Sequence, residues 1–325
     1  MTMLPTIRQF MQALQTPDLS FATLTDAQAV TGADGLPQLR RTTRFAEAEI
    51  DWRGGRWLVS LPLHPSAMRR VEQTVSALRK IDSPALTDYR MLAGELCIEN
   101  NDKTFSHIDL VLQSVPSGGG FSEALASCCG NRLLAAIDAL EAELRRVGFV
   151  HRNLKPANLV WSDGRLYPLR YHDAVTGTDA VSDAAAFEAL RELVRSRTGC
   201  MQVHDAEVAY RPSPRITGHR WASHPFEGLI CVEDETGFGY VDPENRPVIA
   251  SRFRWAGDFR EGRAEVETET GMGVIDRTGA YVVPPCFEIV DYDPVTSRIR
   301  ARRDGQWSEF DYTGRQIAAF GTENE

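Results

Sequence analysis

The stretch GFGYVDPENRPVI (residues 237–249) decides the fold of the last third of the chain, because it returns 34 residues later as GMGVIDRTGAYVV. A fixed period of this length marks a repeat architecture. Each unit contains three short apolar runs without helical spacing, so we predict an all-β array of about three stacked repeats over residues 206–325. The matching positions are glycines and turn aspartates: Gly239 and Gly273, and Asp242, Asp276 and Asp311.

The pattern of these recurring residues indicates a structural role and not a catalytic or metal-binding one. The three aspartates each precede a turn, and such aspartates usually accept hydrogen bonds from the turn backbone, so we expect Asx turns and no metal array. The 34-residue units resemble the bacterial WG repeat. That resemblance implies a β-repeat module whose units pack against one another.

Working outward, the first 200 residues carry mixed patterns. Residues 44–52 (RFAEAEIDW) alternate, a Gly-Gly turn follows, and residues 56–63 return as the second strand of a hairpin. Helical spacing of apolar residues follows from Pro65. We therefore predict an α+β domain with an N-terminal helix in residues 1–39, a strand-rich lobe in residues 40–117 and a helical lobe in residues 118–205.

Two stretches organise the predicted helical lobe. Residues 117–120 (SGGG) indicate a flexible joint between the lobes. Apolar residues from Leu133 to Val147 then recur on one face of a long helix, which Gly148 ends. A last helix is expected near residues 183–195.

Residues 151–158 read HRNLKPAN, between the long helix and a predicted strand–turn–strand. The octet resembles the catalytic loop of protein kinases, HRDLKPxN, at seven of eight positions. The order of elements along residues 40–195 also resembles the kinase fold. The resemblance implies a truncated two-lobed kinase-like domain over residues 1–205, in which Asp183 braces the backbone of the loop.

At several positions the sequence lacks a residue that kinase catalysis requires. Asn153 stands where the family has its catalytic aspartate, and a carboxamide cannot accept a proton; losing a positioned base costs about 10²–10⁴ in rate. By its spacing from Asn158, Tyr171 takes the place of the metal-binding aspartate, and Asp173 lies two residues late. We expect Asp173 to be a solvated turn carboxylate.

The chain also lacks the lysine with which kinases hold the ATP phosphates. The chain has only three lysines, Lys80, Lys103 and Lys155, and none lies on residues 57–63, the strand that would hold the ATP phosphates. His151 and Arg152 are then scaffold residues. Residual nucleotide binding, if any, would use Lys155, Asn158 and Asp173.

Composition limits the partners. The chain has 36 Lys plus Arg and 45 Asp plus Glu, and residues 201–325 hold 14 basic and 22 acidic residues, a net charge of −8. This acidity disfavours nucleic acid and favours a protein partner, in particular a basic one. No apolar run approaches the length of a membrane span, and the six cysteines form no CxxC pair, so we expect a cytoplasmic protein with no membrane partner.

Two functions follow from these patterns. The first is a catalytically inactive pseudokinase-like scaffold or protein-interaction module with an acidic β-repeat surface, which needs no cofactor or metal and whose cleft between the lobes is filled by apolar side chains. The alternative is an atypical nucleotide binder or weak phosphotransferase that uses ATP with magnesium through Asp173, Lys155 and Asn158.

Overall fold

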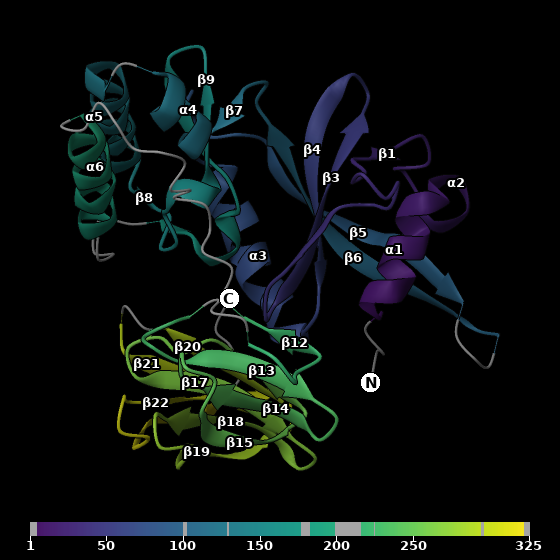
Figure 1. Cartoon of the computed structure of the whole chain (residues 1–325). Coiled ribbons are helices and arrows are strands. Elements are labelled where there is room, and N and C mark those ends of the chain that lie inside the picture. The colour runs from purple at the N-terminus through teal and green to yellow at the C-terminus, as the bar shows by residue number, and fades with distance from the viewer. Residues whose placement is uncertain are drawn as a thin grey trace. The chain divides into compact units, whose positions relative to one another are not determined.

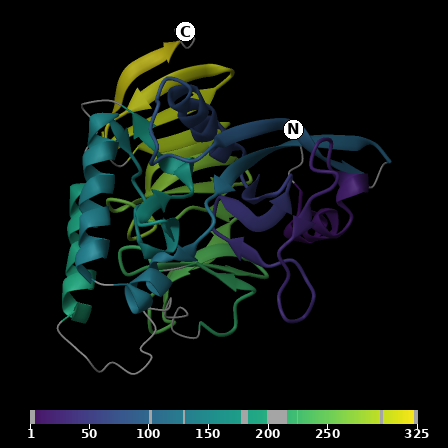
Figure 2. The same ribbon diagram turned by 90° about the horizontal axis from the view of Figure 1, so that it is seen from above.

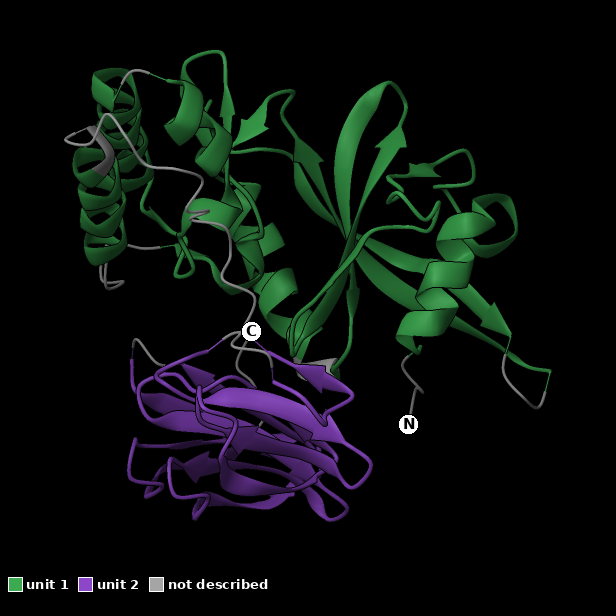
Figure 3. Cartoon of the chain, viewed as in Figure 1, with its two compact units in different colours: residues 1–206 green, residues 207–325 purple. Residues whose placement is uncertain are grey.

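The computed structural model describes residues 5–99, 103–128, 130–176, 183–198, 216–223, 225–293 and 296–321. The chain divides into two compact units, residues 1–206 and 207–325, coloured separately in Figure 3. The predicted boundary between residues 205 and 206 lies outside the described residues, as do Cys129 and Cys200. Each unit is described by itself below.

The first half of the first unit is a six-stranded antiparallel sheet with helices packed on it (Figure 1). Its elements are α1 (Ile7–Gln15), α2 (Pro17–Ser20), β1 (Gln28–Ala29), β2 (Leu39–Arg41), β3 (Phe45–Trp52), β4 (Gly55–Pro62), α3 (Pro65–Leu78), β5 (Tyr89–Glu99) and β6 (Phe105–Val115). The strand order is β1-β3-β4-β6-β5, and β2 pairs with β3. The predicted hairpin is confirmed, with Glu47 opposite Ser60 in its register.

The N-terminal helix covers one face of this sheet. Helix α1 begins with a capping box in which the Thr6 hydroxyl accepts from the backbone N–H of Gln9. Its apolar face buries Phe10 and Leu14 against strand residues such as Ile50. The helix is shorter than the region 1–39 predicted to contain it, because Pro17 opens a separate helical turn and the chain then becomes irregular.

The second half of the first unit is mainly helical. Its elements are β7 (Gly119–Gly120), α4 (Phe121–Ser127), α5 (Gly130–Arg146), β8 (Phe149–Val150), η1 (Pro156–Asn158), β9 (Leu159–Ser162), β10 (Arg165–Pro168), η2 (Tyr171–Asp173), β11 (Val175–Thr176) and α6 (Ala184–Thr198). Helix α5 confirms the predicted long helix, with Leu133, Ile137 and Leu140 on its buried face. Helices α5 and α6 lie side by side in Figures 1 and 2.

The SGGG stretch is a paired strand, which corrects the expectation of a flexible joint. Gly119 and Gly120 form β7, which pairs with β9 opposite Trp161 and Val160. The backbone of Gly118 passes so close to β9 that a Cβ atom there would lie 2.1 Å from the carbonyl oxygen of Trp161. The glycines therefore permit close approach of two backbones at this point.

One hydrophobic core joins the two halves of the first unit. It includes Val71 of α3 and Tyr89 and Val111 of the sheet, together with residues of α4, α5 and α6. The ring of Tyr171 lies in this core, 5.3 Å from the ring of Tyr89 and 5.2 Å from that of Phe149. Because both halves share these contacts, we expect them to unfold together.

The second unit consists of three four-stranded antiparallel sheets. They are β12 (Trp221–Ala222), β13 (Ile230–Asp234), β14 (Gly237–Val241) and β15 (Pro247–Phe253); β16 (Trp255–Ala256), β17 (Arg263–Thr268), β18 (Gly271–Asp276) and β19 (Tyr281–Phe287); and β20 (Ile289–Asp293), β21 (Arg298–Arg303), β22 (Gln306–Phe310) and β23 (Gln316–Gly321). The prediction of three strands per unit missed the first strand of each sheet. In two sheets that strand is two residues long, too short to show an alternating pattern.

The repeats stack through apolar side chains and close turns. Tyr240 and Phe253 of the first sheet pack with Phe259 and Val266 of the second, and a second cluster joins the second and third sheets. The turn glycine Gly314 lies so close to the previous repeat that a Cβ atom there would be 2.0 Å from the carbonyl oxygen of Val282.

The same turn position differs in the first repeat. Gly279 and Gly314 have φ of +84° and +85°, and Asn245 at the equivalent position has φ of +64°. All three backbones are therefore left-handed, which asparagine tolerates and glycine favours. In the part of the chain that the structure describes, the turns of the second and third repeats lie against the repeat before them, and both have glycine there.

Candidate functional site

The loop of residues 151–158 is held by a carboxylate. Asp183, just before α6, accepts hydrogen bonds from the backbone N–H groups of His151 and Arg152 at 2.6 and 2.8 Å. The resemblance to a kinase loop implies contacts of this kind for Asp183. Arg152 has a left-handed backbone with φ of +63°, which the two contacts help to hold.

His151 is a packed, neutral side chain. Its Nε2–H donates to the carbonyl oxygen of Leu169 at 2.8 Å, and its Nδ1 accepts from the backbone N–H of Asn153 at 3.2 Å. The ring has no exposed surface, and burial lowers its pKa. Both ring nitrogens have backbone partners, so the ring fixes the loop and has no lone pair available for a reacting group.

Asn158 is engaged at both ends of its carboxamide. Its Nδ2 donates to the carbonyl oxygen of Asn153 at 2.7 Å, and Nη1 of Arg40 lies 3.4 Å from its Oδ1. The residue is fully buried. Asn158 therefore links the loop to strand β2, across the two halves of the unit. Lys155, at the start of η1, is half-buried.

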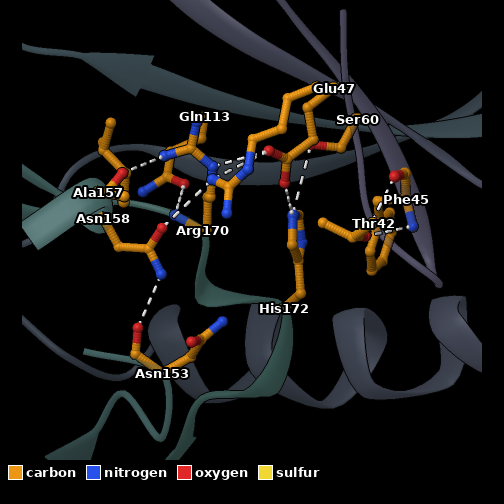
Figure 4. A network of polar contacts seen from close by, with 12 residues as sticks. Thr42, Phe45, Glu47, Ser60, Gln113, Asn153, Ala157, Asn158, Arg170 and His172 are labelled. Atoms are coloured by element: carbon orange, nitrogen blue, oxygen red, sulfur yellow. Dashed lines mark hydrogen bonds and ion pairs between the residues drawn. The ribbon is translucent and has the colours of Figure 1, made fainter. Parts of the chain in front are cut away.

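Glu47 is the centre of a buried ionic network that sequence reasoning missed (Figure 4). Its carboxylate accepts from Nε of Arg170 at 2.7 Å and from Nε2 of His172 at 3.1 Å, and Nη1 of Arg40 lies 3.8 Å away. Only 2% of Glu47 is exposed. Burial alone would raise the pKa of Glu47, but Arg170, His172 and Arg40 together lower it well below its ordinary range.

The partners of Glu47 are themselves fixed. The backbone N–H of Arg170 donates to Oε1 of the buried Gln113 at 2.7 Å, and its Nη1 donates to the carbonyl oxygen of Ala157 at 3.1 Å. His172 stacks on Phe45 with ring centroids 4.0 Å apart, and its Nδ1 lies 3.0 Å from the hydroxyl of Tyr89. The network therefore has a defined geometry.

Asp173 corrects an expectation, because it is buried and ion-paired. Only 8% of the residue is exposed. Its Oδ1 accepts from Nη1 of Arg70 on α3 at 3.1 Å, and Nη1 of Arg44 lies 3.6 Å away. A carboxylate placed between two guanidinium groups in low dielectric is a structural ion pair. The prediction of a solvated turn was wrong because η2 turns the side chain toward α3.

Beside the apolar core that joins the two halves, the region between them also holds polar clusters, which the scaffold hypothesis did not predict. Arg40, Glu47, Arg170 and His172 form one cluster, and Arg70 and Asp173 form a second beside it. Tyr171 does occupy the core, where its hydroxyl accepts from the backbone N–H of Thr87 at 3.1 Å. Burial raises the pKa of Tyr171 to about 12, so the phenol stays protonated.

A groove of about 530 Å³ opens beside the network. It is lined by the SGGG stretch, by Leu159 and Leu169, and by charged residues of the hairpin. Nε of Arg56 in this groove is bonded to Asp51 at 2.7 Å, and its Nη1 to Glu49 at 3.2 Å. The groove therefore has walls of mixed chemistry and a cation already paired with two carboxylates.

The repeat aspartates make the same turn contacts in all three repeats. Oδ1 of Asp276 accepts from the backbone N–H groups of Thr278 and Ala280, at 2.9 and 3.1 Å. Asp242 and Asp311 repeat this pattern. The hydroxyls of Thr278 and Thr313 also donate to Asp276 and Asp311 at 2.6 and 2.7 Å, and these bonds are the main reason that the pKa of both is lowered. The backbone N–H of Arg246 lowers the pKa of Asp242. Gly239 and Gly273 lie where a Cβ atom would meet the neighbouring strand at 2.6 and 2.5 Å.

Buried polar groups also connect successive repeats. Glu265 is buried, and its Oε1 accepts from the backbone N–H of Tyr292 in the third sheet at 2.6 Å. Cys231 holds the equivalent position one repeat earlier, with Sγ 3.6 Å from the carbonyl oxygen of Ala256. Both side chains bind the backbone of the following repeat.

Other features of the described part of the chain are few. Within the described ranges, no three His, Cys, Asp or Glu side chains gather in a way that could hold a metal ion. No helix there is long and apolar enough to cross a membrane. Cys97, Cys128, Cys231 and Cys286 are free thiols.

Comparison with known proteins supports the repeat unit. Curated proteins give no match to the chain. The family model of the WG containing repeat matches residues 238–269, a segment that begins in β14 and ends just after β17. The matched segment thus spans two strands of one sheet and two of the next. The chain contains a WG-containing repeat at residues 238–269, within an array of four-stranded β sheets.

Proposed function

We propose that the chain is a kinase-like protein without phosphotransfer activity, which acts as a scaffold or protein-interaction module. One observation carries the proposal. The polar side chains between the two halves bind one another: Glu47 pairs with Arg170 and His172, and Asp173 pairs with Arg70. In an active kinase these charges would have to face nucleotide phosphates and magnesium.

The loop supports the same proposal. It resembles a kinase catalytic loop, but Asn153 replaces the aspartate that would serve as the base. Asn158 and Asp173, the two oxygen donors predicted for any remaining magnesium site, are engaged by Arg40 and Arg70. A metal ion would have to displace a guanidinium group from each of these two side chains, which costs each cation a contact.

A second candidate, nucleotide binding, is favoured by the groove of about 530 Å³ beside Gly118 and Leu169. A volume of this size suits a small organic ligand. The groove offers apolar walls for a base, but its Arg56 is bonded to Asp51 and Glu49. A neutral nucleoside would therefore fit its charges better than ATP does.

A thermal-shift titration of the full chain separates the two candidates. Wild-type protein is heated with adenosine, ATP and ATP plus magnesium, each at millimolar concentration. A ligand at 100 times its Kd stabilises by about 2.7 kcal/mol, which shifts the melting temperature of a unit this size by several degrees. We expect no shift with ATP plus magnesium. Lys155→Ala, with Lys103→Ala as the matched lysine, tests specificity.

Each result has a defined meaning. A shift with ATP plus magnesium that Lys155→Ala removes and Lys103→Ala keeps would overturn the inactive scaffold. A shift with adenosine alone would support the groove as a nucleoside site while leaving phosphotransfer excluded. An unchanged melting temperature with all three ligands would support the interaction module. In that case the acidic repeat unit should bind a lysine-rich peptide, and added salt should weaken the binding.

A further inference from the structure

The outer strands of the repeat sheets differ in their protection against pairing with another chain. A sheet edge presents unpaired N–H and C=O groups, and proteins guard it with short strands, charges or prolines. Strands β12 and β16 are each two residues long, and β20 carries Asp291 and Asp293. On the opposite edges, β15 carries Pro247 and Arg252, and β19 carries Pro284 and Pro285. These five edges are guarded.

Strand β23 is different from the other five. Its sequence, QIAAFG, contains neither a proline nor a charged residue, and Gln316 to Ala319 are all exposed. Ile317 is 42% exposed on this strand. One side of β23 pairs with β22, and among the described residues no strand pairs with its other side, which is therefore the edge of the sheet. A six-residue uncharged edge of this kind is a template for a further strand.

The broad face of the third sheet is less suited to a partner. The side chain of Arg300 lies opposite Asp291 in the register and 3.7 Å from Glu309 on the next strand. Arg302 pairs in the same way with Glu288 at 2.9 Å. In the earlier repeats the positions of Arg300 and Glu309 are held by residues buried in the stack, such as Cys231 and Tyr240. This face neutralises its own charges and so ends the stack.

We propose that β23 pairs antiparallel with β23 of a second copy of the chain, which gives a two-fold symmetric dimer. The occupant must supply an extended backbone with uncharged side chains, and an identical strand does so without bringing like charges together. A charged peptide would instead be drawn to the carboxylates elsewhere in the repeat unit. Ala318 and Ala319, in the middle of the strand, place little bulk at the two-fold axis.

One strand pair buries a small area, so the dimer is weak and depends on concentration. Analytical ultracentrifugation of the full chain, over a series reaching several hundred micromolar, measures it. Ile317→Lys would place like charges close to one another across the contact and should weaken dimerisation about tenfold or more, or 1.4 kcal/mol and above. Val248→Lys is the matched control, because Val248 is 44% exposed on the equivalent strand of the first repeat.

A second variant tests the backbone directly. Ala319→Pro adds no charge but restricts the backbone and removes one N–H group, and it should also weaken the dimer. Each variant is checked for an unchanged melting temperature. Added salt should not weaken the wild-type dimer, because no ion pair crosses the contact. A wild-type chain that stays monomeric throughout, or a dimer equally sensitive to Val248→Lys, would overturn the proposal.

Discussion

Nη1 of Arg70 on helix α3 lies 3.1 Å from Oδ1 of Asp173, and both side chains are buried. The pair joins the helix that packs under the sheet to the segment that follows β10. Arg44 contacts the same carboxylate from the loop before β3. One carboxylate thus ties three segments, which are distant in sequence, to one point.

Removing the cation at this point should destabilise the first unit. Arg70→Met removes the closer of the two guanidinium groups beside Asp173 and keeps Arg44, so we expect a loss toward the lower end of the 3–5 kcal/mol known for broken buried pairs, about 3 kcal/mol. Urea unfolding measures it. The double variant Arg70→Met with Asp173→Leu should recover part of the loss, since it removes the buried carboxylate, whereas Arg44 loses its contact with that carboxylate. A double variant as unstable as the single one would contradict the ion-pair assignment.

Glu47 should make the unfolding free energy of the first unit depend on pH in the acidic range. Its pKa lies below the ordinary 4.5 in the folded protein, so its contribution is complete above the unfolded pKa and is lost as pH falls through the folded pKa. Glu47→Gln should cost about 3 kcal/mol at pH 7. The difference in unfolding free energy between wild type and Glu47→Gln should shrink below about pH 4.

The control for Glu47 is its neighbour on the same face of β3. The side chain of Glu49 is 41% exposed and pairs with Arg56. Glu49→Gln should cost less than about 1 kcal/mol at pH 7. An equal loss for the two variants would show that burial of Glu47 is not the cause.

Glu265 should be needed for the second and third repeats to hold together. Glu265→Ala leaves the buried N–H of Tyr292 without its acceptor, which costs about 1–3 kcal/mol. The exposed Glu269→Ala, four residues later, is the matched control and should lie within about 0.5 kcal/mol of wild type. Chemical denaturation followed by tryptophan fluorescence compares them. If Glu269→Ala is the more damaging change, the inter-repeat bond is not significant.

Gly305 and Gly314 allow the cost of a left-handed backbone to be measured separately from the cost of a close contact. Gly305 has φ of +74° with nothing near its Cβ position, whereas Gly314 has φ of +85° and the carbonyl of Val282 at 2.0 Å. Gly305→Ala should cost only the conformational term of about 1–2 kcal/mol. Gly314→Ala should cost a further 1–3 kcal/mol or so for overpacking. If the two variants lose the same stability in thermal unfolding, the repeats can move apart to admit the new methyl group without a loss of free energy.

Much of the fold could be predicted from sequence, because the patterns were local. The hairpin of β3 and β4 and the face of α5 follow from periods of two and 3.6 residues. The repeat length followed from recurring glycines and aspartates, and the WG match to residues 238–269 agrees with it. Two of the three missed first strands, β12 and β16, are only two residues long and therefore carry no period.

The ionic network could not be predicted, because it depends on which face of a strand meets which loop. The alternation in β3 places Ala46, Ala48 and Ile50 on one face and Glu47 on the other. Sequence alone assigns such a glutamate to solvent, and only the tertiary fold places Arg170 and His172 over it. For Arg70, a weak signal existed: it lies three residues after Ala67 and four before Thr74, both buried on α3.

Asn245 and Gly314 give the repeat array a direction. A copy of the first repeat inserted in the third position would bring a side chain against the Val282 carbonyl, whereas a copy of the third repeat placed first would meet no such obstacle. The array can therefore lengthen by duplication of its glycine-bearing units, but not by duplication of the unit that begins it.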